Sequence, residues 1–201
     1  MNLLDLLLFP RELYRKLNDR KLTLYLGVIF IGIVDVAFML DKHYTRLFAD
    51  KSGDALIYRI ALLCLLIVAI GVIDVIFTCV PLFDLFKKFK AEPEAPVLTA
   101  TIVRLMKAYI MSHFILIPVE AVLYLAKNNI NMIPKDIIFF AGLIGTIIPF
   151  WFSAIITRGI NTIYSFQPFY RSLVFMVVFI WTSILGWVLS YSLDNWIMKL
   201  F

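Results

Sequence analysis

Charged side chains are scarce in this 201-residue chain. Only 16% of its residues are Asp, Glu, Lys or Arg, whereas 62% are hydrophobic, and the mean hydropathy is +0.92. A single soluble domain of this size cannot bury so much apolar surface in one core. The composition therefore excludes a soluble globular protein and predicts that lipid surrounds much of the chain.

Cysteine and catalytic motifs are also sparse. The two cysteines, Cys64 and Cys79, fall in one apolar run, where a helix would separate them by about 22 Å, too far for a disulfide. Neither belongs to a CxxC pair and no HExxH motif occurs, so the sequence supports no metal site and no cofactor. Because GxSxG and phosphate-binding glycine loops are also missing, we expect a protein that is not an enzyme.

The chain does contain long apolar runs. Runs of about 20 residues are long enough to cross the hydrocarbon core of a bilayer as a helix. They predict an all-α, polytopic membrane protein with five transmembrane helices in one domain, residues 22–201. The predicted spans are residues 22–40, 60–83, 108–126, 137–157 and 172–193.

The Lys and Arg residues are distributed unevenly about these spans. With a cytosolic N-terminus, seven of the 19 Lys and Arg would lie outside: Lys42, Arg46, Lys51, Arg59, Lys127, Lys135 and Lys199. The other twelve would be cytosolic, so this bias predicts an N-terminus in the cytosol and a C-terminus outside, across the cell membrane if the source is a prokaryote. No nucleic-acid-binding motif is present, and the net charge of +5 indicates attraction to lipid headgroups.

The N-terminal residues 1–21 are predicted to form a cytosolic segment lying in the membrane interface. Leucines at helical spacing alternate with basic residues, which is typical of an interfacial amphipathic helix. Pro10 should break or start a helix, with Glu12 in the first turn of the second piece. Together with the loop after the second span, this segment supplies a predicted lipid-facing basic patch: Arg11, Arg15, Lys16, Lys87, Lys88 and Lys90.

Three carboxylates fall inside the predicted spans, namely Asp35, Asp74 and Glu120. An ionised carboxylate in hydrocarbon costs at least about 2.5 kcal/mol on insertion scales, so such residues usually face the bundle interior and are candidate site residues. His113 lies two turns before Glu120 on the same helix face. We therefore predict an intramembrane polar site of Asp35, Asp74, Lys107, His113 and Glu120.

The predicted depths of these groups suggest how they pair. Asp35 and Glu120 would share a level in the outer half, whereas Asp74 would lie roughly 10 Å deeper, which argues against a two-aspartate protease. Lys107 is the predicted ion-pair partner of Asp74. Asp35 and Glu120 either form a coupled pair that holds a proton or a cation, or bind separate hydrogen-bond partners.

A short internal repeat links the first two spans: GIVDVAF at residues 32–38 and GVIDVIF at residues 71–77. Its Gly, Asp and Phe recur at i, i+3 and i+6, which places each glycine beside a carboxylate on one helix face. The glycine would let another backbone approach closely. The repeat predicts that the two spans pack through related faces, as a pseudo-twofold pair or by chance convergence.

The opening LLLFPRELYRKLNDRK, the five spans and the inner turn that begins TRGINTIY resemble the Yip family of five-span, Rab-interacting membrane proteins. Its eukaryotic members are Golgi and ER proteins implicated in vesicle traffic. The DLYGP motif of those members is absent, since DLFKK stands at residues 84–88, so the resemblance does not carry Rab binding to this chain. The compact form is similar to the prokaryotic branch.

Two functions remain open from the sequence. The first is a non-enzymatic protein of membrane organisation that binds a protein partner at its cytosolic face, where basic and aromatic segments concentrate. The second is a small proton or cation transporter or channel that uses the intramembrane carboxylates. Either function is compatible with a homo-oligomer.

Overall fold

The computed structural model describes residues 3–49, 52–89, 98–128 and 135–197. Every regular element in these ranges is a helix, in agreement with the predicted all-α class. The elements are α1 (Leu3–Leu8), α2 (Arg11–Arg15), α3 (Lys21–Phe48), α4 (Asp54–Lys88), α5 (Leu98–Asn128), α6 (Lys135–Tyr164), α7 (Tyr170–Ser192) and a π-helical turn, η2 (Leu193–Ile197).

Within the described ranges, four helical segments are long and apolar enough to cross a membrane: Asp54–Lys88, Ala100–Ala126, Phe139–Tyr164 and Tyr170–Ile197. These segments contain the second, third and fifth predicted spans and all but the first two residues of the fourth, as expected of a multi-pass membrane protein. The first predicted span, residues 22–40, lies within the 28-residue helix α3. That helix is not among the four, so a fifth crossing stays a prediction.

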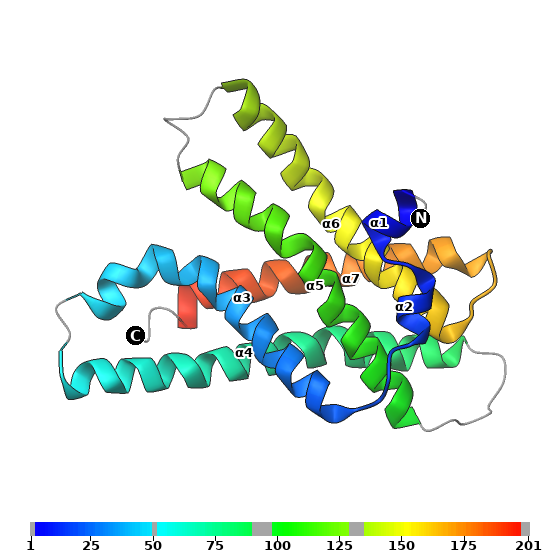
Figure 1. Ribbon diagram of the computed structural model, residues 1–201, viewed down its shortest axis with the longest axis horizontal. Coiled ribbons are helices and arrows are strands. Elements are labelled where there is room, and N and C mark those ends of the chain that lie inside the picture. Colours follow the sequence, from blue (N-terminus) through cyan, green and yellow to red (C-terminus); the bar gives the residue numbers. More distant parts are fainter. Residues whose placement is uncertain (1–2, 50–51, 90–97, 129–134, 198–201) are drawn as a thin grey trace.

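The long helices form two hairpins that diverge from a common end (Figure 1). Helices α3 and α4 form one antiparallel pair, with α7 beside α4, and α5 and α6 form the other. Where the hairpins meet, α5 packs against both α3 and α4. A cluster of buried side chains from α3 to α7 joins them, with Phe86, Leu105, Ile160 and Val178 each 2% exposed or less. The hairpins therefore share one core at this end and separate toward the other.

The N-terminal segment is docked on α6. Pro10 precedes α2 and Glu12 lies in its first turn, as predicted. Tyr14 is only 1% exposed, and its hydroxyl lies 3.2 Å from the carbonyl oxygens of Leu8 and Ile155. Burial raises the pKa of this hydroxyl, which therefore stays protonated and able to donate. The segment consists of two short helices held by protein contacts, and its place in a membrane interface stays a prediction.

Two further contacts fasten α1 to α6. The indole nitrogen of Trp151 donates to the carbonyl oxygen of Leu7 at 2.7 Å, and Arg158 forms a hydrogen-bonded ion pair with Asp5. A charged pair with its hydrogen bond in place is the usual way to hold a partly buried arginine.

Helices α3 and α4 cross at the two glycines of the internal repeat. A Cβ built on Gly32 would overlap the carbonyl oxygen of Ile67, and one built on Gly71 would overlap that of Val28. Each glycine thus meets the carbonyl four residues before the other, which is a local twofold arrangement of an antiparallel pair. The prediction that the first two spans pack through related faces is confirmed.

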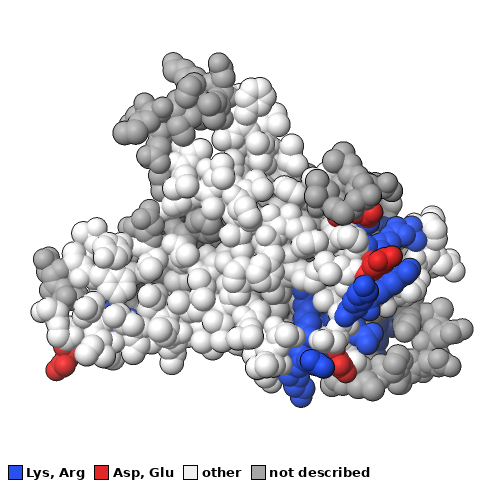
Figure 2. All heavy atoms as spheres, viewed as in Figure 1, with Lys and Arg blue, Asp and Glu red and all other residues white. Residues whose placement is uncertain are grey.

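Basic side chains gather at the end where α2 lies (Figure 2). Arg11, Arg15, Lys16, Lys87 and Lys88 are all exposed, as the predicted basic patch requires, and Lys90 lies outside the described residues. Most of the visible surface elsewhere is uncharged. Contact of this patch with lipid stays a prediction, as does the placement of Lys199, which is also outside the described residues.

Candidate functional site

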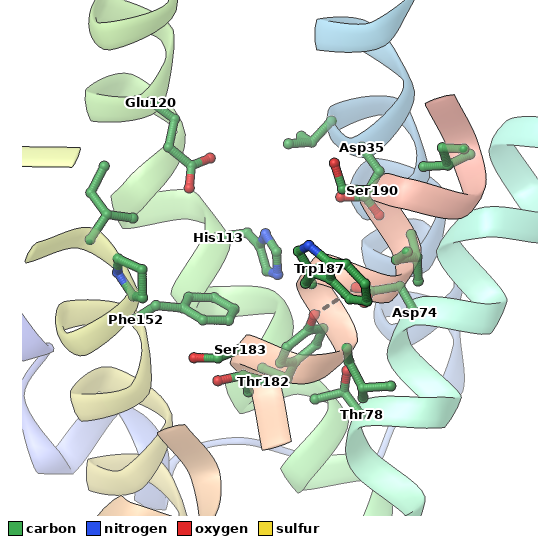
Figure 3. Close-up of a pocket in the computed structure, with 18 of the residues that line it drawn as sticks. Asp35, Asp74, Thr78, His113, Glu120, Phe152, Thr182, Ser183, Trp187 and Ser190 are labelled. Atoms are coloured by element: carbon green, nitrogen blue, oxygen red, sulfur yellow. Dashed lines mark hydrogen bonds between the residues drawn. The ribbon is translucent and has the colours of Figure 1, made fainter. Parts of the chain in front are cut away.

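A cavity of about 620 Å³ lies between the diverging hairpins, with residues from α3, α4, α5, α6 and α7 in its walls (Figure 3). Four of the five predicted site residues line it: Asp35, Asp74, His113 and Glu120. Its size is within the range of small-molecule pockets in proteins. The structure thus brings the three carboxylates of the predicted spans to one chamber.

Helix α5 supplies one wall of this cavity. Tyr109, His113, Glu120 and Tyr124 all line it, because separations of 4, 11 and 15 residues return to nearly the same side of a helix with 3.6 residues per turn. The His113 ring is packed edge-on between Tyr109 and Phe152, with ring centroids 4.9 and 4.8 Å away. This packing fixes the orientation of the imidazole toward the cavity.

Asp35 and Asp74 stand on the wall opposite Glu120 (Figure 3). Each aspartate follows a glycine of the α3–α4 crossing by three residues, or about 4.5 Å of helix rise. Because the helices are antiparallel, the two carboxylates are displaced in opposite directions, by about 9 Å in total. This displacement agrees with the predicted difference in depth. Asp35 and Glu120 face the cavity at one level, while their coupling stays a prediction.

Asp74 is paired with a tyrosine. The Tyr109 hydroxyl donates to Asp74 Oδ2 at 2.6 Å, and both residues are buried. The predicted ion pair between Asp74 and Lys107 is wrong, since the Lys107 ammonium donates to the main-chain oxygen and Oδ1 of Asn18. Lys107 and Tyr109 are two residues apart, so their side chains leave α5 in directions about 200° apart around the helix axis. Lys107 therefore points away from the side of α5 that carries Tyr109, and it does not belong to the cavity.

Two buried polar atoms of the cavity residues are left without a partner. Asp35 Oδ2 and His113 Nε2 have no hydrogen-bond partner among the described residues. Buried polar atoms nearly always have one, and an unpaired atom costs about 1–3 kcal/mol. Both residues line the cavity, but the two atoms themselves have almost no accessible surface, so a ligand or water would reach them only after the side chains rotate.

Helix α7 closes the cavity with small polar side chains that the sequence reasoning missed. Thr182, Ser183 and Ser190 line it together with Trp187, and the Thr182 hydroxyl lies 3.2 Å from that of Ser153 on α6. Ser183, Trp187 and Ser190 recur at intervals of four and three residues, and this spacing was the available signal, as was that of Tyr109 before His113. Hydroxyls are common in transmembrane helices, so neither signal singles out a site without the fold.

Comparisons with protein families, curated proteins and solved structures find no match to this chain. The resemblance to the Yip family is accordingly neither supported nor contradicted by them.

The hydrogen bond between Tyr109 and Asp74 should contribute to the stability of the fold. Tyr109→Phe removes the only hydroxyl that donates to Asp74 Oδ2 among the described residues, and we expect a loss of about 1.5–3 kcal/mol, the range for hydrogen bonds to charged groups. In a double-mutant cycle with Asp74→Leu, which removes the acceptor, measured by unfolding in mixed micelles, the double variant should lose at least about 1 kcal/mol less than the sum of the single losses. Strictly additive losses would show that the two side chains do not interact.

Proposed function

We propose that this chain is a five-span membrane protein that binds a small organic cation in its central cavity and moves it across the bilayer. The observation that carries the proposal is the meeting of three carboxylates, Asp35, Asp74 and Glu120, around one chamber. Asp35 Oδ2 is buried without a partner, and rotation of this carboxylate toward the chamber would let a ligand N–H group supply one. Carboxylates inside a membrane carry an energetic cost, which favours a functional role for them.

The other cavity residues favour an organic cation with an apolar portion. Aromatic side chains of Tyr109, Phe152 and Trp187 line the chamber beside the carboxylates. Aromatic faces attract cations through their quadrupole, and apolar walls bind the uncharged part of a ligand. The imidazole of His113 offers a further polar group. A protonated amine combines the two properties that this lining complements.

The test is transport by the full chain in proteoliposomes. We expect uptake of protonated 2-phenylethylamine and no uptake of 2-phenylethanol, which has a similar shape without the charge. Asp35→Asn and Glu120→Gln should each lower uptake at least about tenfold, because a charge-assisted hydrogen bond contributes about 1.5–3 kcal/mol. Asp54→Asn is the matched control, since Asp54 is exposed at the start of α4 and away from the cavity.

Equal uptake of the amine and the alcohol would contradict the proposal, as would undiminished uptake by Asp35→Asn and Glu120→Gln. If the wild type binds the amine in detergent but transports none, the cavity is a receptor site and the transport step is wrong.

Membrane organisation through a protein partner is a second candidate, which the resemblance to the Yip family favours. The supporting observation is the exposure of Arg11, Arg15 and Lys16 on a segment fixed to α6. Rigid presentation of basic side chains lowers the entropy cost of binding an acidic partner. Under this function, Arg11→Gln and Arg15→Gln should abolish partner capture, whereas Asp35→Asn should leave it unchanged.

A further inference from the structure

A second cavity, of about 380 Å³, lies between α3 and α5 at the basic end of the molecule. Its walls are apolar along most of their length, formed by Leu26 and Phe30 of α3 and by Ile110 and Phe114 of α5. Lys16 and Lys107 line the same cavity. It is therefore a groove with an apolar body and two ammonium groups.

The ammonium of Lys107 is unusually situated. The residue is only 7% exposed, and its nitrogen donates to the main-chain oxygen of Asn18 at 2.9 Å and to Asn18 Oδ1 at 2.7 Å. Both acceptors are neutral, and among the described residues the carboxylate of Asp19 acts on this ammonium only from beyond ion-pair distance. An ammonium has three donors, so one remains for an anion, whose charge would compensate the buried cation.

The apolar part of the groove faces outward from the bundle. Leu26 and Phe114 are each more than half exposed, and the rings of Phe30 and Phe114 are stacked with centroids 4.2 Å apart. Leu26 and Phe30 are one turn apart, as are Ile110 and Phe114, so the walls extend at least about 6 Å along the helices. The α5 wall belongs to the segment Ala100–Ala126, which is apolar enough to span a membrane.

We propose that this groove binds an anionic glycerophospholipid. The phosphate lies against the ammonium groups of Lys16 and Lys107, and an acyl chain lies along Leu26, Phe30, Ile110 and Phe114. A lysine pair at the polar boundary and an apolar wall below it match the two parts of such a lipid. The inference requires the chain to be in a membrane, and it is independent of what the central cavity binds.

Native mass spectrometry of the full chain in detergent can test this inference. We expect dioleoylphosphatidylglycerol to be retained at least fivefold more than dioleoylphosphatidylcholine, whose acyl chains are the same. Lys16→Gln and Lys107→Gln should each remove most of that preference. Met111→Trp, which adds bulk at another lining residue, should lower the retention of both lipids alike. The double variant Lys87→Gln and Lys88→Gln is the control, because both lysines are exposed on α4.

Three results would overturn the proposal. One is equal retention of the two lipids by the wild type. Another is an equal loss of the phosphatidylglycerol preference in the Lys87 and Lys88 double variant, which would attribute the preference to surface charge. The third is complete displacement of phosphatidylglycerol by millimolar inorganic phosphate, which would assign the site to a free anion. Lys16 is exposed, so Lys16→Gln decides the question even if Lys107→Gln fails to fold.

Discussion

Replacing Gly71 by valine is expected to destabilise the bundle by about 3 kcal/mol or more. A Cβ at this position would overlap the carbonyl oxygen of Val28 and lie 2.9 Å from the backbone nitrogen of Gly32. Main-chain atoms cannot rotate away as a side chain can, so α3 and α4 must separate. Overpacking against adjustable side chains typically costs about 1–3 kcal/mol, and this contact is less adjustable.

Two measurements check this expectation. Unfolding in mixed micelles should show the loss of stability, and proteoliposome uptake should fall as well, because Asp35 and Asp74 each follow a crossing glycine by three residues. Gly145→Val is the matched control, since nothing lies within 4 Å of a Cβ built on Gly145. Valine is a better helix former than glycine, so this control should be neutral or slightly stabilising. Equal losses in the two variants would show that the close crossing of α3 and α4 does not limit stability.

Replacing Tyr14 by alanine is expected to release the N-terminal segment from α6. Tyr14 is the buried side chain of α2, and truncating a fully buried aromatic residue costs about 3–5 kcal/mol. Because α1 and α2 have only six and five residues, they cannot persist as isolated helices. We therefore expect trypsin to cleave after Arg11 and Arg15 at least tenfold faster in this variant.

Two other variants separate the causes. Tyr14→Phe keeps the ring and loses the hydroxyl, so it should lose only about 1 kcal/mol of docking free energy. Leu13→Ala, at a neighbouring residue that is 38% exposed, should be cleaved at nearly the wild-type rate. Cleavage of Tyr14→Ala at the wild-type rate would show that Trp151 and Arg158 hold the segment without the tyrosine.

Hydropathy and glycine spacing allowed much of this architecture to be predicted. Uncharged runs located the helices, because a bilayer leaves few alternatives to a helix, and Pro10 marked the start of α2. The shared Gly and Asp spacing of the two repeats predicted the face through which α3 and α4 pack. It also placed Asp35 and Asp74 beside that contact.

The remaining features depend on long-range packing. Tyr14 among basic residues has the same helical pattern whether it lies on lipid or on α6, and only the fold shows that it is buried. The predicted depth of Lys107 is close to that of Asp74, but its direction around α5 turns it toward Asn18. Depth can be estimated from a hydropathy profile, whereas rotation about the helix axis requires knowing which neighbours the helix has.

The glycine crossing also has a mechanical consequence. At Gly32 and Gly71 the two backbones are in direct contact, and Val36 of α3 packs with Leu66 and Ile70 of α4 beside that contact. Asp35 and Asp74 lie on opposite sides of the glycine contact, about 4.5 Å from it along their helices. A small change in the crossing angle would shift both carboxylates at once, and the spacing of charges in the chamber would follow the angle between the two helices.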